Sequence, residues 1–121
     1  MSVLPGILLV RTKFDPNATN SETFRKWYDQ VHIPDLLSTS GPESAFRFEV
    51  AGDVSPATWP YLAVYPLRNI GWLLSEELAM VPLTSDILPG PTRHVQDVAS
   101  FDMRSYELLA EEGSGDRGKE S

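Results

Sequence analysis

The stretch Phe24–Leu37, FRKWYDQVHIPDLL, has the spacing of an amphipathic helix and carries a histidine two residues before a proline. At about 100° per residue, one face of this helix collects the side chains of Phe24, Trp27, Tyr28, Val31 and Asp35. His32 lies at the edge of that face. Pro34 lacks an amide hydrogen and disfavours helical dihedral angles at Ile33, so we expect the helix to kink or end there. The stretch predicts an aromatic packing face beside a group that can transfer protons, with a purely structural histidine as the alternative.

The segment before this helix predicts a strand and a helix start. Ile7–Val10 is an unbroken apolar run, which is typical of a strand buried on both faces. Thr19 and Glu22 have the spacing of a capping box. We therefore expect Thr19 to cap the helix.

Two strands are predicted after the helix. Residues 45–50, AFRFEV, alternate in polarity, and we expect the apolar side (Phe46, Phe48 and Val50) to pack on the helices. Arg47 then points either to solvent or into an interior cavity. The run Tyr61–Tyr65 is a second strand that Pro66 should stop.

The last third of the chain predicts another helix, a long connection and a final strand. Asn69 is the expected cap of an amphipathic helix whose apolar side carries Ile70, Leu73, Leu74 and Leu78, with Trp72 nearer the other side. Residues 81–93 are rich in proline and apolar side chains, as expected of a lid over a pocket or of a packed surface loop. Val98–Leu109 alternates as a strand, with Phe101 and Met103 opposite Asp102, Arg104 and Tyr106.

The order strand, helix, strand, strand, helix, strand predicts an α+β fold of the ferredoxin-like βαββαβ type. Its four-stranded antiparallel sheet carries both helices on one face. A second copy of the chain is the simplest cover for the other face, so we expect a homodimer, a dimeric α+β barrel. We expect a single domain over residues 1–109 and a disordered acidic tail over residues 110–121.

Composition excludes several classes of function. The chain has 121 residues, no cysteine, and ten basic against seventeen acidic residues, for a net charge of −7. These values argue against disulfides, thiolate chemistry and nucleic-acid binding. The N-terminal apolar run is too short to span or anchor in a membrane, which favours a soluble cytoplasmic protein. Two histidines sixty residues apart predict no metal site, and we expect no cofactor.

Four stretches together resemble the EthD-like group of dimeric α+β barrel proteins, especially its small fungal-type members. They are WYDQVHIPDLL (27–37), the pair Arg47-Phe48, YLAVY (61–65) and MRSYELL (103–109). The resemblance implies a homodimer with a pocket between helix and sheet, and it implies that His32 is the catalytic residue. Characterised relatives act without cofactors on polyketide-like or aromatic substrates. Val31 stands where many relatives have glutamate, so a carboxylate that would orient the imidazole is absent here.

The residues support three functional hypotheses. The first is a cofactor-independent lyase, cyclase or isomerase that acts on an aromatic or polyketide-type intermediate, including decarboxylation, dehydration or aldol-type cyclisation, with His32 as general acid and base. The second is a non-catalytic binding protein for a hydrophobic small molecule, and the third is a metal-free monooxygenase. The expected catalytic residues are His32, Tyr28 and Arg47. The expected substrate-binding residues are Phe24, Trp27, Asp35, Tyr61, Tyr65, Trp72 and Tyr106.

Overall fold

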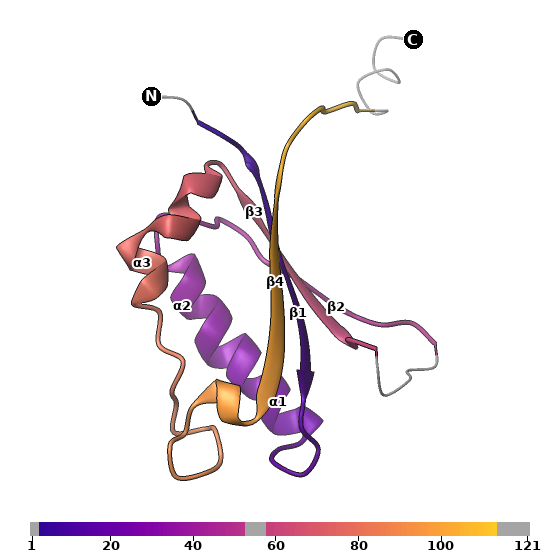
Figure 1. The fold of residues 1–121 in the computed structure, drawn as a ribbon, viewed down its shortest axis with the longest axis vertical. Coiled ribbons are helices and arrows are strands. Elements are labelled where there is room, and N and C mark those ends of the chain that lie inside the picture. The colour runs from indigo at the N-terminus through magenta and orange to yellow at the C-terminus, as the bar shows by residue number, and fades with distance from the viewer. Residues whose placement is uncertain (1–2, 53–57, 114–121) are drawn as a thin grey trace.

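The chain folds as an α+β structure with a four-stranded antiparallel sheet in the order β2-β3-β1-β4, as predicted for a ferredoxin-like fold. The computed structural model describes residues 3–52 and 58–113. All described helices lie on one side of the sheet (Figure 1). The strands are β1 (Gly6–Phe14), β2 (Phe46–Glu49), β3 (Tyr61–Leu67) and β4 (Ala99–Glu107). The α-helices are α1 (Ser21–Trp27), α2 (Ile33–Leu37) and α3 (Glu76–Ala79).

Strand β1 is central and pairs with β3 on one side and with β4 on the other. Leu8, Val10 and Thr12 point into the layer beneath the helices and are buried. Ile7 and Leu9 alternate with them and are only half-buried. The prediction of a strand buried on both faces is therefore wrong for the single chain, because the described helices cover one face only.

The side chains of strand β2 point to the opposite faces of the sheet from those predicted. Phe46 and Phe48 are half exposed, and they lie on the face that no described element covers. Arg47 pairs with Ala63, a buried residue of β3, and so points to the helix side. Strand β3 continues through Pro66 to Leu67, whereas we expected it to stop. The pairing with β2 ends at Val64, so β3 is an edge beyond that point, where a proline is tolerated.

The first helix begins one residue later than predicted and contains a widened turn. Asn20 caps α1, its side chain accepting a hydrogen bond from the Thr23 amide at 2.8 Å. The predicted capping role of Thr19 is wrong. Between α1 and α2 the chain forms one π-helical turn over Tyr28–His32, closed by a bond from the Ile33 amide to the Tyr28 carbonyl. The proline ring at position 34 would clash with the carbonyl one α-helical turn earlier, and the widened turn relieves that clash.

The predicted second helix is two short pieces. A 3-10 helix covers Ile70–Leu74, and α3 follows after Ser75, whose extended backbone and side-chain cap start a new helix. Asn69 caps the 3-10 helix, as predicted. Trp72 is buried and Leu74 is 94% exposed, which reverses the expected faces.

The connection 81–93 packs on the domain rather than extending from it. Leu88 is buried, and Thr84 forms an isolated β-bridge with His94. A 3-10 helix, Val95–Asp97, leads into β4, whose two faces divide as predicted. The predicted tail lies mainly outside the described residues, and residues 110–113 are exposed without helix or strand.

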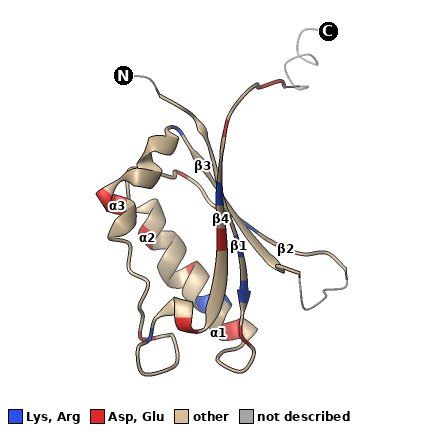
Figure 2. Cartoon of the chain, viewed as in Figure 1, with Lys and Arg blue, Asp and Glu red and all other residues tan. Residues whose placement is uncertain are grey.

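The described residues include no helix that is both long and apolar enough to cross a membrane. Lys and Arg lie mainly on the sheet and α1, while acidic residues lie on the helices, on the loops and on β4 (Figure 2). The core lies between the helices and the sheet and is rich in aromatic side chains, including Phe24, Trp27, Tyr28 and Tyr65.

Candidate functional site

A cavity of about 260 Å³ lies between the helix layer and the sheet. The sheet contributes Leu8, Val10, Tyr65, Phe101 and Met103 to its lining, and the first helical segment contributes His32 and Leu36. The remaining walls are Leu78 and Ala79 from α3, Val81 and Leu83 from the following connection, and Val95 and Gln96 from the last 3-10 helix. The connection 81–93 thus covers part of a pocket, which agrees with the lid interpretation. An engineered apolar cavity of about 150 Å³ binds benzene, so this cavity has room for a molecule of roughly one to two rings.

The π-helical turn places His32 in this cavity. The imidazole stacks on the Trp27 indole with ring centroids 4.6 Å apart and planes 14° apart. Residues five apart lie about 140° apart around a regular α-helix and do not face each other. The widened turn brings them into register. The Tyr28 ring meets the imidazole edge-on at 5.3 Å, so two aromatic rings fix the orientation of the histidine.

Burial keeps His32 neutral. Its Nδ1 atom is enclosed and has no hydrogen-bond partner among the described residues. Burial lowers the pKa of His32 from 6.5 to about 4, since the charged imidazolium loses its hydration in this apolar environment. Asp35, which we expected near the histidine, borders a separate surface hollow, and no hydrogen bond or ion pair joins the two side chains in the described structure. At neutral pH the site therefore holds an unprotonated base.

Two buried tyrosines lie beside the histidine. Tyr28 and Tyr65 are each 1% exposed, and their hydroxyls form no hydrogen bond of good geometry with the described residues. Burial raises the pKa of Tyr28 to about 12, against smaller opposite effects of Tyr65 and Arg47. Burial and the neighbouring Tyr28 also raise the pKa of Tyr65. Both hydroxyls therefore stay protonated at neutral pH, and protein atoms enclose both of them.

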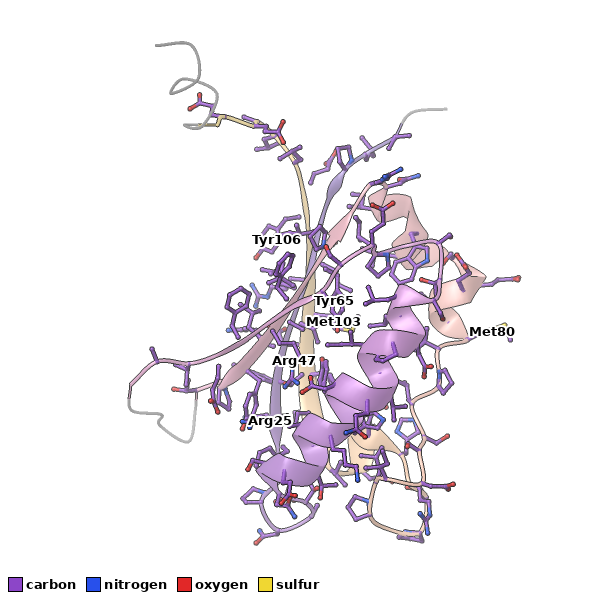
Figure 3. The ribbon with its side chains drawn as sticks, turned by 180° about the vertical axis from the view of Figure 1, so that it is seen from behind. Arg25, Arg47, Tyr65, Met80, Met103 and Tyr106 are labelled. Atoms are coloured by element: carbon purple, nitrogen blue, oxygen red, sulfur yellow. The ribbon has the colours of Figure 1, made fainter. Side chains whose placement is uncertain are left out.

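Arg47 lies outside the cavity lining. Its guanidinium forms an ion pair with Asp29 and covers the Tyr28 ring at 4.5 Å from the ring centroid. Figure 3 shows Arg47 beside the first helix, on the same side of the sheet as Tyr65 and Met103. Arg47 therefore contacts Tyr28, another predicted catalytic residue, and reaches the cavity only through that ring.

The other predicted binding residues separate into three places. Phe24 and Tyr61 join Phe14 in an aromatic cluster at the far end of the first helix. Trp72 packs on Gly41, where an added Cβ would lie 2.2 Å from its ring. Tyr106 is half exposed on the opposite face of the sheet, away from the cavity (Figure 3). Trp27 touches the site through its stack on His32.

Sequence reasoning missed most of the cavity wall. Phe101 and Met103 were detectable from the alternation of β4, and Leu36 from its place in the first helix. Gln96 had no comparable signal, because it belongs to a three-residue 3-10 helix. Its amide nitrogen is bonded to His94 Nδ1 at 3.1 Å, so the second histidine serves as a helix cap.

Within residues 3–52 and 58–113, no three His, Asp or Glu side chains gather where they could hold a metal ion. The polar groups in and around the cavity are instead an imidazole, hydroxyls, an indole N–H and a carboxamide. Such groups can bind neutral oxygen and nitrogen functions and can move a proton.

One known protein is similar to this chain over most of its length. Core atranone cluster (CAC) protein 1 of Stachybotrys chlorohalonatus (strain IBT 40285) is 31% identical over 112 residues, which cover 90% of this chain and 46% of the relative. The chain thus spans about half the length of the curated relative that it matches. No protein-family model and no solved structure matches the chain.

Proposed function

We propose that this protein is a cofactor-independent enzyme of secondary metabolism that transfers protons within a small apolar intermediate, as a lyase, cyclase or isomerase. The observation that carries the proposal is a buried, unprotonated histidine in the wall of a largely apolar cavity without a charged lining residue. A base in such a place meets a substrate from which water has been displaced.

In this mechanism His32 removes a proton from the carbon next to a substrate carbonyl. Nδ1 is enclosed, so Nε2 accepts the proton. The electron pair of the C–H bond forms a C=C bond, the π pair of the carbonyl moves onto its oxygen, and an enolate results. The imidazolium and the enolate attract each other strongly in the low dielectric of the cavity, which offsets the low proton affinity of the free histidine. Return of the proton to another atom of the substrate completes an isomerisation. In a cyclisation the enolate carbon attacks a second carbonyl carbon, the π pair of that carbonyl moves onto its oxygen, and the imidazolium of His32 gives its proton to the resulting alkoxide.

The metabolic context of the proposal comes from the relative, whose name places it in a core atranone cluster. The four motifs of the sequence support the further proposal that the chain is an EthD-like protein. Both statements concern a relative or a group of relatives, so the reaction of this chain needs its own test.

The test incubates a panel of aromatic β-keto acids, poly-β-ketones and their neutral esters with the wild type and with His32→Phe, in air and without oxygen. His32→Phe keeps a ring on Trp27 and removes the base. Products are resolved by liquid chromatography and mass spectrometry. Product that forms without oxygen and falls at least 100-fold in the variant, about the value of one positioned base, supports the proposal. Oxygen-dependent product would assign the metal-free monooxygenase activity instead.

The second candidate is a binding protein for an apolar small molecule. The observation that favours it is that the enclosed Nδ1 of His32 has no hydrogen-bond partner among the described residues, so no polar group supports the imidazole as a base. A ligand that binds wild type and His32→Phe equally, with no turnover of any panel member, would select this candidate.

We also propose that the chain forms a homodimer through the face of the sheet that the helices leave open. Phe46 and Phe48, 50% and 53% exposed, lie there beside the apolar Val64. On the β4 side of this face Arg11 donates from Nε to the Asp102 carboxylate at 2.8 Å. The open face is thus apolar on the β2 side and charged on the β4 side. A second copy related by a two-fold axis would present the same two regions and could contact both.

Sedimentation velocity tests the dimer. Phe48→Glu should shift the protein to monomer, whereas Leu74→Glu, which places the same charge on an exposed residue of the helix side, should leave the dimer intact. A wild-type protein that sediments as a monomer at 100-fold dilution and at high concentration alike would refute this assembly.

A further inference from the structure

The cavity contains no fixed charge. Of its thirteen lining side chains, ten are hydrocarbon or thioether, and the other three are His32, Tyr65 and Gln96. None of these three carries a charge at neutral pH, since burial holds His32 in its neutral form. The Tyr65 hydroxyl is enclosed by protein atoms. His32 and Gln96 are therefore the described lining residues whose polar groups can meet a ligand directly.

The cation that stacks on Tyr28 already has an acidic partner. Arg47 is bonded to Asp29 and stacked on the outer side of Tyr28, and its side chain is 19% exposed. A carboxylate placed in the cavity would lose its hydration without gaining a cationic partner, which is among the largest penalties in protein binding. A neutral carbonyl loses much less and needs one donor to be satisfied.

Gln96 is placed to be that donor. Its backbone amide is held by the His94 cap, which fixes the start of the 3-10 helix, and Gln96 is an exposed residue that borders both the cavity and the surface groove next to β4. No described residue hydrogen-bonds to the Gln96 carboxamide. The group can therefore turn to donate to a substrate oxygen or accept from a hydroxyl.

We infer that the cavity selects neutral oxygen-bearing molecules of one to two rings, such as ketones, enones, lactones or esters, over their carboxylate counterparts, and that Gln96 is the residue that binds the oxygen. The inference rests on the proposed function in one respect, that the cavity is the substrate site. It separates reactions of neutral carbonyl compounds, such as isomerisation, dehydration and cyclisation, from decarboxylation of a free acid.

Three ligands of nearly equal shape test the inference by equilibrium dialysis at pH 7.5: 2-acetylnaphthalene, 2-naphthoate and 2-isopropenylnaphthalene. The ketone should bind at least 100-fold more tightly than the carboxylate, a difference of about 2.7 kcal/mol. In Gln96→Leu the ketone should lose about fivefold in affinity while the hydrocarbon changes less than twofold. Asp97→Asn, which alters the next residue of the same 3-10 helix, should change neither.

Each contrary result overturns a defined part of the inference. Carboxylate affinity within threefold of the ketone would refute charge selection. Equal effects of Gln96→Leu on the ketone and on the hydrocarbon would remove Gln96 from oxygen binding. Absence of binding of all three ligands at millimolar concentration would overturn the assignment of the cavity. A loss of turnover in His32→Phe together with tight carboxylate binding would keep the proposed function and refute this inference alone.

Discussion

Acid should destabilise this protein through His32 in a pH range where carboxylates contribute little. The histidine has a pKa of about 4 in the folded chain, against 6.5 for the exposed side chain of the unfolded chain. Protons therefore bind the unfolded state more tightly than the folded state. The stability that His32 maintains is fully present above pH 6.5 and is lost as the pH falls from 6.5 towards 4.

The size of the effect follows from the two pKa values. At pH 5 the unfolded histidine is almost fully protonated and the folded one almost fully neutral, which costs about 2 kcal/mol relative to pH 7. The complete loss, reached near pH 4, is about 3 kcal/mol. His32→Phe removes the titrating group, so its free energy of unfolding should fall with pH by about 2 kcal/mol less than that of the wild type between pH 7 and pH 5.

Urea denaturation followed by far-UV circular dichroism measures both curves. Both proteins are best compared in a His94→Asn background, which leaves His32 as the one remaining histidine of the chain and keeps a side chain able to cap the 3-10 helix. Carboxylates titrate in both variants, and their effects cancel in the difference. Parallel curves between pH 7 and pH 5, or a His32 pKa above 6 measured by NMR, would refute the claim that the imidazole is buried as the structure indicates.

Three further variants test local features. Gly41→Ala should destabilise the fold by about 1–3 kcal/mol in urea denaturation, because the new methyl would overlap the Trp72 ring. Asn20→Ala should lower the free energy of unfolding by about 1 kcal/mol, because it removes the cap of α1. Thr19→Val should cost less, because it removes a buried hydroxyl without a partner in the described structure. A larger loss in Thr19→Val than in Asn20→Ala would show that Thr19 caps the helix after all. Arg47→Met should leave the dialysis affinity for 2-acetylnaphthalene within threefold, since the guanidinium does not line the cavity, and a tenfold loss would show direct contact.

The antiparallel four-stranded sheet was predictable from the order of the elements, and the two faces of β4 were predictable because alternation with a period of two follows directly from strand geometry. Alternation does not say which face is inside. In β2 the apolar side points away from the helices because Arg47 finds both a carboxylate and an aromatic face on the helix side. The contacts of Arg47 with this carboxylate and this ring therefore outweighed the general tendency of Phe46 and Phe48 to be buried.

The place of His32 beside the aromatic residues of the first helix was predictable, but the rest of its surroundings was not. Ser75 caps α3 and divides the expected second helix; serine favours such caps, but the apolar spacing across it predicted one continuous helix. Gln96 joins the cavity because three separate segments meet there, which no local pattern records. The same is true of Asp35, which is one helical turn from His32 in sequence yet borders another hollow.

The π-helical turn changes the rotational register between α1 and α2, the two halves of the first helix. Phe24 and Leu36 are twelve residues apart, and in a regular α-helix they would point about 120° away from each other. The widened turn holds one extra residue, so the rotation corresponds to eleven residues and the two side chains return to within about 20°. Both are buried, at 1% and 3% exposure. By the same arithmetic, a chain shortened by one residue within 28–32 could run as a regular α-helix with both side chains still aligned, whereas one inserted residue would turn Leu36 by about 100° out of the core.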